Sequence, residues 1–367
     1  METPPDAPPL LRAEISEGAL RANLRRLRAM DPDAELVGVV KADAYGHGAT
    51  LVAGWLRNEG VERLAVATLA EGAALRAAGD AGRILVLGAP LPEHLPAYAR
   101  LGLDVSVTSS DVATSVADAG LSLTAHVKVD TGMHRLGLAP ADVPDALRRL
   151  RAAPGVTVES IWTHLATADA ADASFADEQV ARFTAVLASV EAPPVVHVAN
   201  GPAHVRALAR LAGRRRWVRV GGPLYGLASD AALAGAMAGL QPVMRLVTRV
   251  VHLQTVAAGE TVSYGRTWTA DAPTRVATLA GGYADGLPRA LQQGAAVGIG
   301  GHLVPVVGRV CMDMALVAPA EGMHTGDEAV WWGPGGPSAE DVAARLGTIA
   351  YELTTGLTAR VPRVAVG

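Results

Sequence analysis

The sequence has a single cysteine, Cys311, among its 367 residues. One cysteine excludes a disulfide within the chain and is typical of a reducing compartment. Long apolar segments are absent as well: no run of about 18 apolar residues occurs, and the N-terminus lacks the basic region and apolar core of a signal peptide. The sequence therefore predicts a cytoplasmic protein that does not associate with a membrane.

No block of one charge occurs either. The net charge is −4, from 32 basic and 36 acidic residues that are interspersed along the chain. Without a basic stripe the sequence does not favour a nucleic-acid partner, and the ten histidines are scattered without ligand spacing, so no metal site is predicted. What the chain does have is length and apolar content, since 50% hydrophobic residues over 367 positions suffice for two domains that act on a small molecule.

The first two thirds of the chain alternate between short apolar runs and Ala- and Arg-rich stretches of helical period. The runs lie at residues 36–40, 64–68, 84–88, 103–107, 124–130, 156–164, 195–200 and 217–222. Eight strands that alternate with helices predict an α/β protein with a (β/α)8, TIM-like barrel, although a doubly wound sheet alternates in a similar way. The barrel is favoured because polar residues such as Lys41, Lys128 and Arg219 fall near strand ends, where barrels build active sites.

Beyond residue 240 the helical pattern gives way to β-runs. These runs lie at 244–256, 274–280, 295–299, 303–314 and 329–332, followed by one helix from a Ser338 N-cap to about residue 346. We therefore predict a disordered Pro-rich start at residues 1–10, a barrel at 11–239 and a mostly β C-terminal domain at 240–367.

One decapeptide indicates the chemistry. Residues 39–48 read V-V-K-A-D-A-Y-G-H-G, so that Lys41 stands at the end of a predicted strand, ahead of a Gly-rich turn. Partial desolvation lowers the pKa of a lysine at such a place and frees its amine to form a Schiff base, while Tyr45 and loop amides could hold a phosphate. The alternative is a surface lysine that caps a strand end.

The decapeptide resembles the signature of the alanine racemase family, whose lysine carries pyridoxal 5'-phosphate (PLP). The resemblance implies the same order of barrel and β domain and an isomerase that interconverts L- and D-alanine, for use in cell-wall peptidoglycan. Racemisation needs an electron sink and two acid/base groups. Lys41 would be one base. Residues 261–266, T-V-S-Y-G-R, look like the family's tyrosine motif, which makes Tyr264 the second base; without the resemblance, Tyr264 would be read as a core or interface residue.

Further residues receive roles from the same resemblance. Arg219, within W-V-R-V-G-G-P-L-Y-G at 217–226, matches the position that faces the pyridine nitrogen, and with His164 it would form a hydrogen-bond chain to Tyr264. An arginine does not give up its proton near neutral pH, so the ring nitrogen would stay unprotonated. The alternative for Arg219 is a surface salt bridge. The other residues expected at the cofactor are Tyr45, Asn200, Gly201, Gly221, Gly222 and Tyr351.

Substrate contacts are expected from Arg135, Tyr283 and Met312. Arg135 lies in H-V-K-V-D-T-G-M-H-R-L-G at 126–137, where the lysine that matches Lys128 is carbamylated in the family; the alternative is a plain lysine paired with Asp130. Two positions depart from the family pattern, because serine is usual at Gly201 and a branched aliphatic residue at Gly222. Losing the hydroxyl donor predicts PLP binding weaker by about 1 kcal/mol.

The resemblance also implies a head-to-tail homodimer in which Tyr264 enters the partner's active site. Two other functions remain open at this point. One is a serine or broad-specificity amino-acid racemase, against which the bulky Tyr351 at the pocket wall argues by steric exclusion. The other is a non-catalytic PLP-binding protein of cofactor homeostasis, which would need no second base such as Tyr264.

Overall fold

The structure is a computed structural model that describes residues 9–209, 211 and 213–367. Most of the predicted disordered start, residues 1–8, lies outside the described residues. The chain forms two compact units. The barrel unit comprises Arg21–Leu224 and Asp230–Leu240, and the β unit comprises the chain up to Leu20, Tyr225–Ser229 and Gln241–Gly367.

The barrel unit contains eight parallel strands that close into a ring, because β9 pairs with β2 as well as with β8. The strands are β2 (Ala34–Val39), β3 (Arg63–Val66), β4 (Arg83–Val86), β5 (Asp104–Val107), β6 (Leu123–Lys128), β7 (Val156–Trp162), β8 (Val195–His197) and β9 (Arg215–Val220). The predicted barrel is confirmed, and the doubly wound sheet is excluded by the closure. Nearly continuous apolar strands suit this fold, since parallel strands are covered on both faces.

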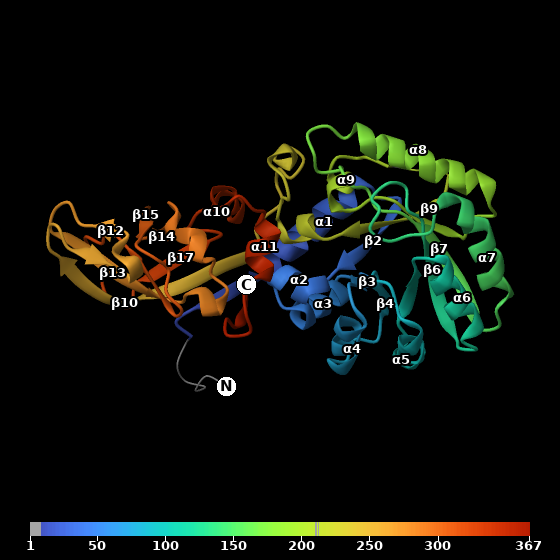
Figure 1. Cartoon of the computed structure of the whole chain (residues 1–367), viewed down its shortest axis with the longest axis horizontal. Helices are drawn as coiled ribbons and strands as arrows, with labels where there is room; N and C mark the ends of the chain where they lie inside the picture. Colours follow the sequence, from blue (N-terminus) through green and yellow to red (C-terminus); the bar gives the residue numbers. More distant parts are fainter. Residues whose placement is uncertain (1–8, 210, 212) are drawn as a thin grey trace. The chain divides into compact units, whose positions relative to one another are not determined.

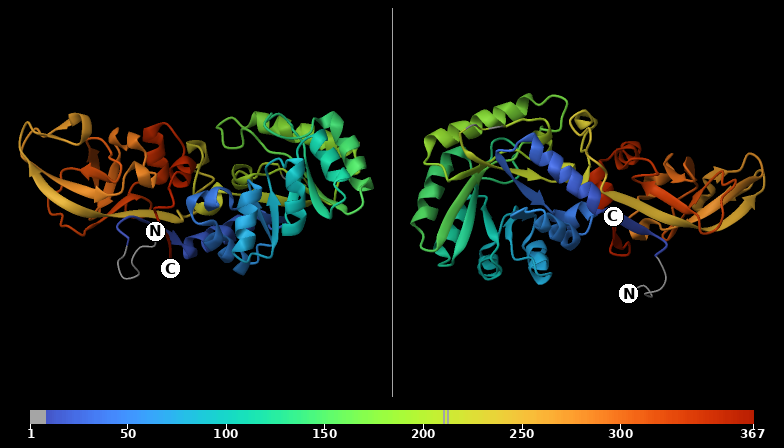
Figure 2. Two further views of the ribbon diagram at one scale, coloured as in Figure 1. Left: turned by 60° about the horizontal axis from the view of Figure 1, so that its bottom comes forward. Right: turned by 180° about the vertical axis from the view of Figure 1, so that it is seen from behind.

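Helices follow the strands, and α3 to α8 lie outside the ring (Figures 1 and 2). The helices of this unit are α1 (Glu17–Met30), which belongs to it from Arg21 on, α2 (Lys41–Gly46), α3 (Ala49–Asn58), α4 (Leu69–Ala77), α5 (Leu95–Leu101), α6 (Ser110–Asp118), α7 (Val143–Ala152), α8 (Ser174–Ser189) and α9 (Gly201–Val205). Local sequence sets their starts: Ser16 caps α1 by accepting from Ala19 N–H at 3.1 Å, and Thr68 with Glu71 forms a capping box on α4.

The β unit is built on a mostly antiparallel sheet. Its strands are β1 (Arg12–Ser16), β10 (Met244–Val256), β13 (Thr274–Ala280), β14 (Ala296–Ile299), β15 (His302–Val307), β16 (Met314–Val317), β17 (Glu328–Trp332) and β18 (Arg363–Val366), with a small pair of β11 (Thr261–Val262) and β12 (Trp268–Thr269). The long curved β10 (Figure 2) pairs with both β17 and β13, so six strands form a closed ring. Helices α10 (Ala339–Leu346) and α11 (Ala350–Thr355) complete the unit, and Ser338 caps α10 as predicted.

The N-terminal strand differs from the expected domain boundary. We placed residues 11–20 with the barrel, but β1 pairs antiparallel with β10 and parallel with β18, and residues up to Leu20 group with the β unit. A second short piece, Tyr225–Ser229, also belongs to the β unit. The physical reason is hydrogen bonding: β1 supplies the only described partner of β18, and Ala13 N–H donates to Pro362 O at 3.0 Å.

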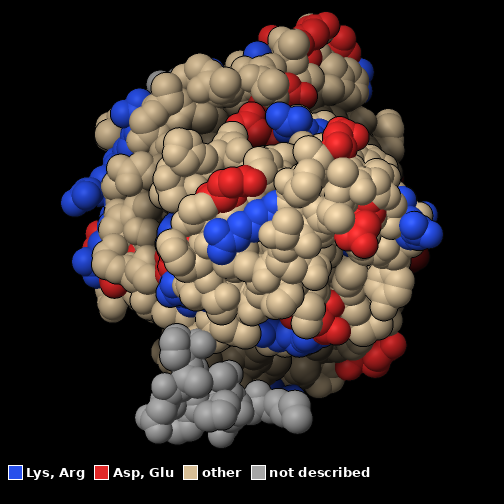
Figure 3. All heavy atoms as spheres, turned by 90° about the vertical axis from the view of Figure 1, so that its left-hand side faces the viewer, with Lys and Arg blue, Asp and Glu red and all other residues tan. Residues whose placement is uncertain are grey.

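Among the described residues, no helix is both long and apolar enough to cross a membrane. On the face drawn in Figure 3, basic and acidic side chains alternate and neither sign gathers into a broad patch. This surface agrees with the interspersed charges of the sequence.

Candidate active site

Lys41 directly follows the residue after β2, at the C-terminal mouth of the barrel. Burial, together with the nearby Arg135, lowers the pKa of Lys41, and Glu71 opposes this shift. Its Nζ lies 6.0 Å from the centre of the Tyr45 ring. A lysine with these surroundings has a larger fraction of neutral, nucleophilic amine than one in water.

The four residues after Lys41 form a left-handed turn. Ala42, Asp43, Ala44 and Tyr45 have φ between 52° and 55°, a conformation that costs a non-glycine residue roughly 1–2 kcal/mol. Hydrogen bonds hold it: Ala42 N–H donates to Glu71 Oε1 at 2.6 Å, and Asp43 Oδ1 accepts from Ala49 N–H at 2.7 Å. Backbone strain of this kind concentrates at functional sites, and here it turns Tyr45 back toward β9.

A close contact between Tyr45 and Gly221 shapes the next part of the site. A Cβ at Gly221 would lie 2.3 Å from Tyr45 Oη, so only glycine fits there. Burial raises the pKa of Tyr45 to about 12, which keeps the phenol protonated and able to donate. Next to it, a Cβ at Gly201 would lie 2.7 Å from Pro223 Cδ. This contact gives a physical reason for glycine where the family usually has serine.

Two buried backbone donors lie at the same place. Within the described part of the chain, the N–H groups of Gly201 and Gly222 donate to no acceptor. Asn200 does not add its side chain to them, because its Oδ1 accepts from Ala203 N–H at 3.1 Å and its Nδ2 donates to Leu165 O at 3.2 Å. Asn200 therefore caps α9 and holds Gly201 in position.

Arg219 is buried in β9, with 3% of its surface exposed, which excludes the surface salt bridge. Nη1 donates to His197 Nδ1 at 2.9 Å and to His197 O at 3.0 Å, and Nη2 donates to Thr163 O at 2.8 Å and to Val198 O at 3.2 Å. Burial lowers the pKa of Arg219 to about 9, so it stays charged at neutral pH. Its Nε–H has no acceptor among the described residues, which leaves one donor for a bound group.

Cations dominate the charge at this end of the barrel. Burial, then Arg135 and Arg219, lowers the pKa of Lys128 to about 8, and burial with the same arginines and both lysines lowers the pKa of His164 well below its usual value. Asp130 does not form an ion pair with Lys128 in the described structure, since its carboxylate accepts from Gly132 and His134 N–H groups. His164 Nδ1 lies 3.3 Å from Arg219 Nη2, the first link of the expected chain to Tyr264.

The remaining predicted residues belong to the β unit. Tyr264, in a turn at Tyr264–Arg266, is 71% exposed, and Ser263 beside it donates to Arg309 O at 2.6 Å. Tyr283 N–H donates to Cys311 O at 3.0 Å, so Tyr283 and Tyr264 both adjoin the segment that leads to the exposed Met312. Tyr351, in α11, has its hydroxyl 3.5 Å from Leu227 O.

Two residues at the barrel mouth escaped the sequence analysis. His197 accepts the bond from Arg219 Nη1, and the Trp162 ring lies 4.9 Å from Lys128 Nζ and 4.8 Å from the Arg219 guanidinium carbon. Both sit inside apolar strand runs that look like core. Their positions in the sequence could have indicated them. Trp162 ends β7 shortly before His164, and His197 ends β8 shortly before Asn200.

The fold and this arrangement define a class: an enzyme with a desolvated lysine at the mouth of a (β/α)8 barrel, followed by a β unit. The family model "Alanine racemase, N-terminal domain" matches residues 15–229, and "Alanine racemase, C-terminal domain" matches residues 243–365. The chain belongs to the alanine racemase family.

Similar proteins support this assignment over the full length. A protein of Chlorobaculum tepidum named alanine racemase is 38% identical, covering 99% of this chain and 97% of its own. The solved alanine racemase of Clostridium difficile 630 superimposes with a TM-score of 0.92 at 33% identity, covering 98% of this chain and 97% of its own. That of a D-cycloserine-producing Streptomyces lavendulae gives a TM-score of 0.90 at 36% identity, covering 99% and 98%.

Proposed function

We propose that this protein is a PLP-dependent isomerase that interconverts L- and D-alanine. The observation that carries the proposal is the desolvated Lys41 at the end of β2, in a chain whose two units both match this family. PLP would supply an electron sink for the negative charge that develops when the α-proton leaves. The cytoplasmic location and the supply of D-alanine to peptidoglycan stay predictions.

The donors around Gly221 suit this cofactor. The N–H groups of Gly201 and Gly222 and the protonated hydroxyl of Tyr45 would bind its phosphate, since Gly221 lets Tyr45 approach the same place. The free Nε–H of Arg219 would donate to the pyridine nitrogen. Because a guanidinium keeps its proton, this nitrogen would accept a hydrogen bond without becoming protonated.

Proton exchange needs a base on each face of the substrate. Lys41 would hold the proton on one face and Tyr264 on the other. Because Arg219 can only donate, His164 Nδ1 must act as the acceptor in their 3.3 Å contact, which puts the His164 proton on Nε2. An Nε2–H is the donor that would stabilise an ionised Tyr264 hydroxyl. Tyr264 would come from the partner subunit of a homodimer, where its 71% exposure would be lost.

Arg135 would bind the substrate carboxylate, with Met312 and Tyr283 near the same group. Carbamylation of Lys128 would turn a buried cation among arginines into an anion. The neutral amine attacks CO2 and releases one proton, so a pKa of about 8 favours the reaction near neutral pH. The carbamate would then orient Arg135 by a charge-assisted bond.

The decisive experiment incubates the purified protein and PLP separately with L-alanine, D-alanine and L-serine and measures the enantiomers by chiral chromatography. We expect both alanine enantiomers to reach the same 1:1 mixture, and serine to react much more slowly. PLP binding without racemisation of any amino acid would favour the homeostasis protein instead. Equal rates with alanine and serine would favour a broad-specificity racemase.

A further inference from the structure

Below Arg219 a row of polar side chains crosses the interior of the barrel unit. His197, Ser160 and His126 come from the adjacent strands β8, β7 and β6 and are at most 1% exposed. His197 Nε2 lies 2.8 Å from Ser160 Oγ, and the same oxygen lies 2.6 Å from His126 Nδ1. The barrel interior is therefore not closed by apolar side chains alone. Ser160 Oγ joins the two histidine rings, whereas His126 Nε2 makes no hydrogen bond to the described residues.

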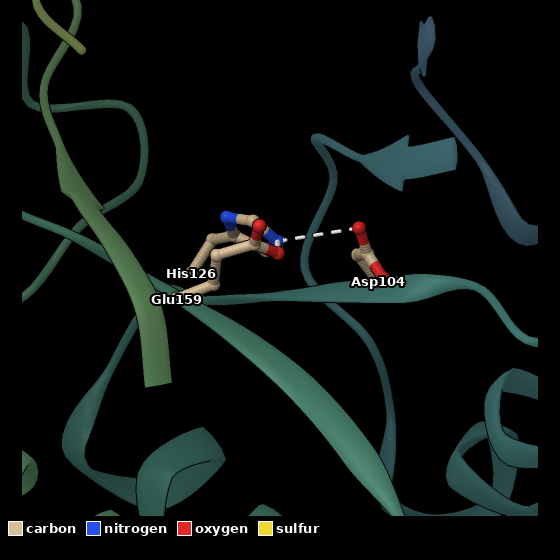
Figure 4. A group of neighbouring side chains, drawn as sticks. All are labelled: Asp104, His126 and Glu159. Atoms are coloured by element: carbon tan, nitrogen blue, oxygen red, sulfur yellow. Dashed lines mark ion pairs between the residues drawn. The ribbon is translucent and has the colours of Figure 1, made fainter. Parts of the chain in front are cut away.

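The row ends on carboxylates. His126 Nε2 lies 3.4 Å from Asp104 Oδ2 and 3.8 Å from Glu159 Oε2 (Figure 4). Asp104 is the first residue of β5, whereas Arg219 lies at the second-last position of β9. Strands of a parallel barrel share their direction, so the row joins the N-terminal end of the barrel to the mouth that carries the candidate site.

The donor-only chemistry of Arg219 determines the His197 tautomer and favours one arrangement of the protons beyond it. Arg219 can only donate, so His197 Nδ1 accepts and the ring proton lies on Nε2. That Nε2–H donates to Ser160 Oγ, which leaves the Ser160 hydroxyl hydrogen for His126 Nδ1. His126 then carries its proton on Nε2, and this N–H faces the two carboxylates. In His197 the opposite tautomer would place two donors against each other at Arg219. In His126 it would deprive the Ser160 hydroxyl hydrogen of this acceptor.

We propose that this buried chain positions the Arg219 guanidinium in the candidate active site, with both of its histidines neutral and protonated on Nε2. Its members are His197, Ser160, His126 and Asp104. They are positioning residues, because His197 acts on the site through its bonds to Arg219 and its stacking on Trp162, and the others act through His197. The direction of the pKa of His197, which burial and Arg219 hold well below its usual value, agrees with a neutral ring.

A bound metal ion would be the other use of this cluster. Asp104, His126 and Glu159 bring ligand atoms within 4.8 Å of one another. Both carboxylates already have cationic partners, however, since Arg83 Nη2 lies 3.0 Å from Asp104 Oδ2 and 2.6 Å from Glu159 Oε2, and Arg63 Nη2 lies 3.1 Å from Glu159 Oε1. A cation would have to displace these arginines. The two arginines already neutralise the carboxylates that His126 Nε2 faces.

The chain has a consequence for Arg219. Apart from its contact with His164, Arg219 donates four hydrogen bonds, and two of them go to His197. The bond to the His197 ring forms only if Nδ1 is unprotonated. Removing the Ser160 hydroxyl leaves a buried His197 Nε2–H and a buried His126 Nδ1 without partners, which lets both rings rotate or change tautomer. Arg219 would then keep its three carbonyl acceptors but lose the ring acceptor that helps to set the orientation of its guanidinium.

The first test needs no cofactor and no activity. Apoprotein labelled with [15N]histidine is studied by NMR at neutral pH, and the two rings are assigned with His126→Asn and His197→Asn variants. We expect an unprotonated Nδ1 and a protonated Nε2 in both rings. A proton on Nδ1 of either ring, or a doubly protonated ring, would overturn the proposal.

The second test compares Ser160→Ala with Ser106→Ala. Ser106 is an equally buried serine on β5 whose hydroxyl donates to Val86 O at 2.6 Å, outside the chain. In the apoprotein we expect the His197 Nε2 resonance to move only in Ser160→Ala. A second measurement uses the PLP-loaded protein and rests on the proposed function. There we expect only Ser160→Ala to show a roughly tenfold lower kcat, an unchanged KM for alanine and a shifted cofactor absorption band. Equal behaviour of the two variants would overturn the positioning role. An inactive wild type would contradict only the proposed function, because the NMR result stands by itself.

Discussion

Arg219 shows how the bonds of one side chain determine its use. Nη1 and Nη2 are taken by histidine and carbonyl acceptors, while Nε–H is left for a bound group. The sequence indicated Arg219 and its donor-only chemistry through the family resemblance. It did not indicate His197 or Ser160, because a polar residue inside an apolar strand looks like core until the strands that face it are known.

A prediction for Lys41 follows from its lowered pKa. Borohydride converts a Schiff base into a stable secondary amine, so reduction of the PLP-loaded protein should attach the cofactor to Lys41. Peptide mapping by mass spectrometry measures the site of the label. We expect the label on the peptide that contains Lys41 and no racemisation above background in Lys41→Ala. Label on any other lysine would contradict the assignment.

Lys128 allows a prediction with a defined pH dependence. Its amine is mostly protonated well below pH 8 and neutral above it, so a carbamate should form as the pH rises through this value and be lost as it falls. With 13C-bicarbonate, NMR should show a carbamate carbon whose signal grows between pH 6 and 8. We expect the signal in Lys41→Ala but not in Lys128→Met, where the KM for alanine should rise about tenfold. A wild type without the signal would leave Lys128 a plain lysine.

At the scale of elements, the apolar runs predicted all eight barrel strands because parallel strands buried on both faces need them. The left-handed turn at residues 42–45 was not predictable, since three of its four residues, Ala42, Ala44 and Tyr45, have no local preference for it and only Asp43 tolerates it. It is held by distant acceptors such as Glu71, on α4. The partner of β1 was not predictable either, because the sequence of a short strand does not show which strand lies beside it.

The turn and β9 together give a prediction. In Gly221→Ala the new methyl group would meet Tyr45, which the strained turn prevents from moving away. We expect PLP to bind roughly tenfold more weakly, measured by absorbance titration of the apoprotein. Gly54→Ala is the control, because a Cβ there meets nothing within 4 Å. It should keep the PLP affinity and raise the free energy of unfolding by up to about 1 kcal/mol.

The placement of β1 in the β unit is testable by hydrogen exchange. Ala13→Pro removes the N–H that donates to Pro362 O, so the β18 amides should exchange faster, with about 1–3 kcal/mol less protection, while the barrel strands are unchanged. Ala13→Gly keeps this N–H and should affect β18 much less. Faster exchange in β2 or β9 with an unchanged β18 would contradict the assignment of β1.

At the scale of the whole molecule, the two proposed bases are carried by different units. Lys41 belongs to the barrel unit, and the exposed Tyr264 belongs to the β unit. We expect a two-fold dimer in which each site combines Lys41 of one chain with Tyr264 of the other. The single interface of a closed symmetric dimer forms two such sites. If one chain lacks a base, only one of these two sites is affected.

This arrangement makes Lys41→Ala and Tyr264→Phe complementary. In a mixed dimer one site receives both intact residues and the other receives neither. Random exchange of equal amounts makes about half of the dimers mixed, each with one working site of two, so roughly a quarter of wild-type activity should return. Subunit exchange is verified independently with differently tagged chains, and each variant mixed with itself is the control. If Tyr264 serves Lys41 of its own chain, every site lacks one base, and the mixture recovers nothing above the separate variants.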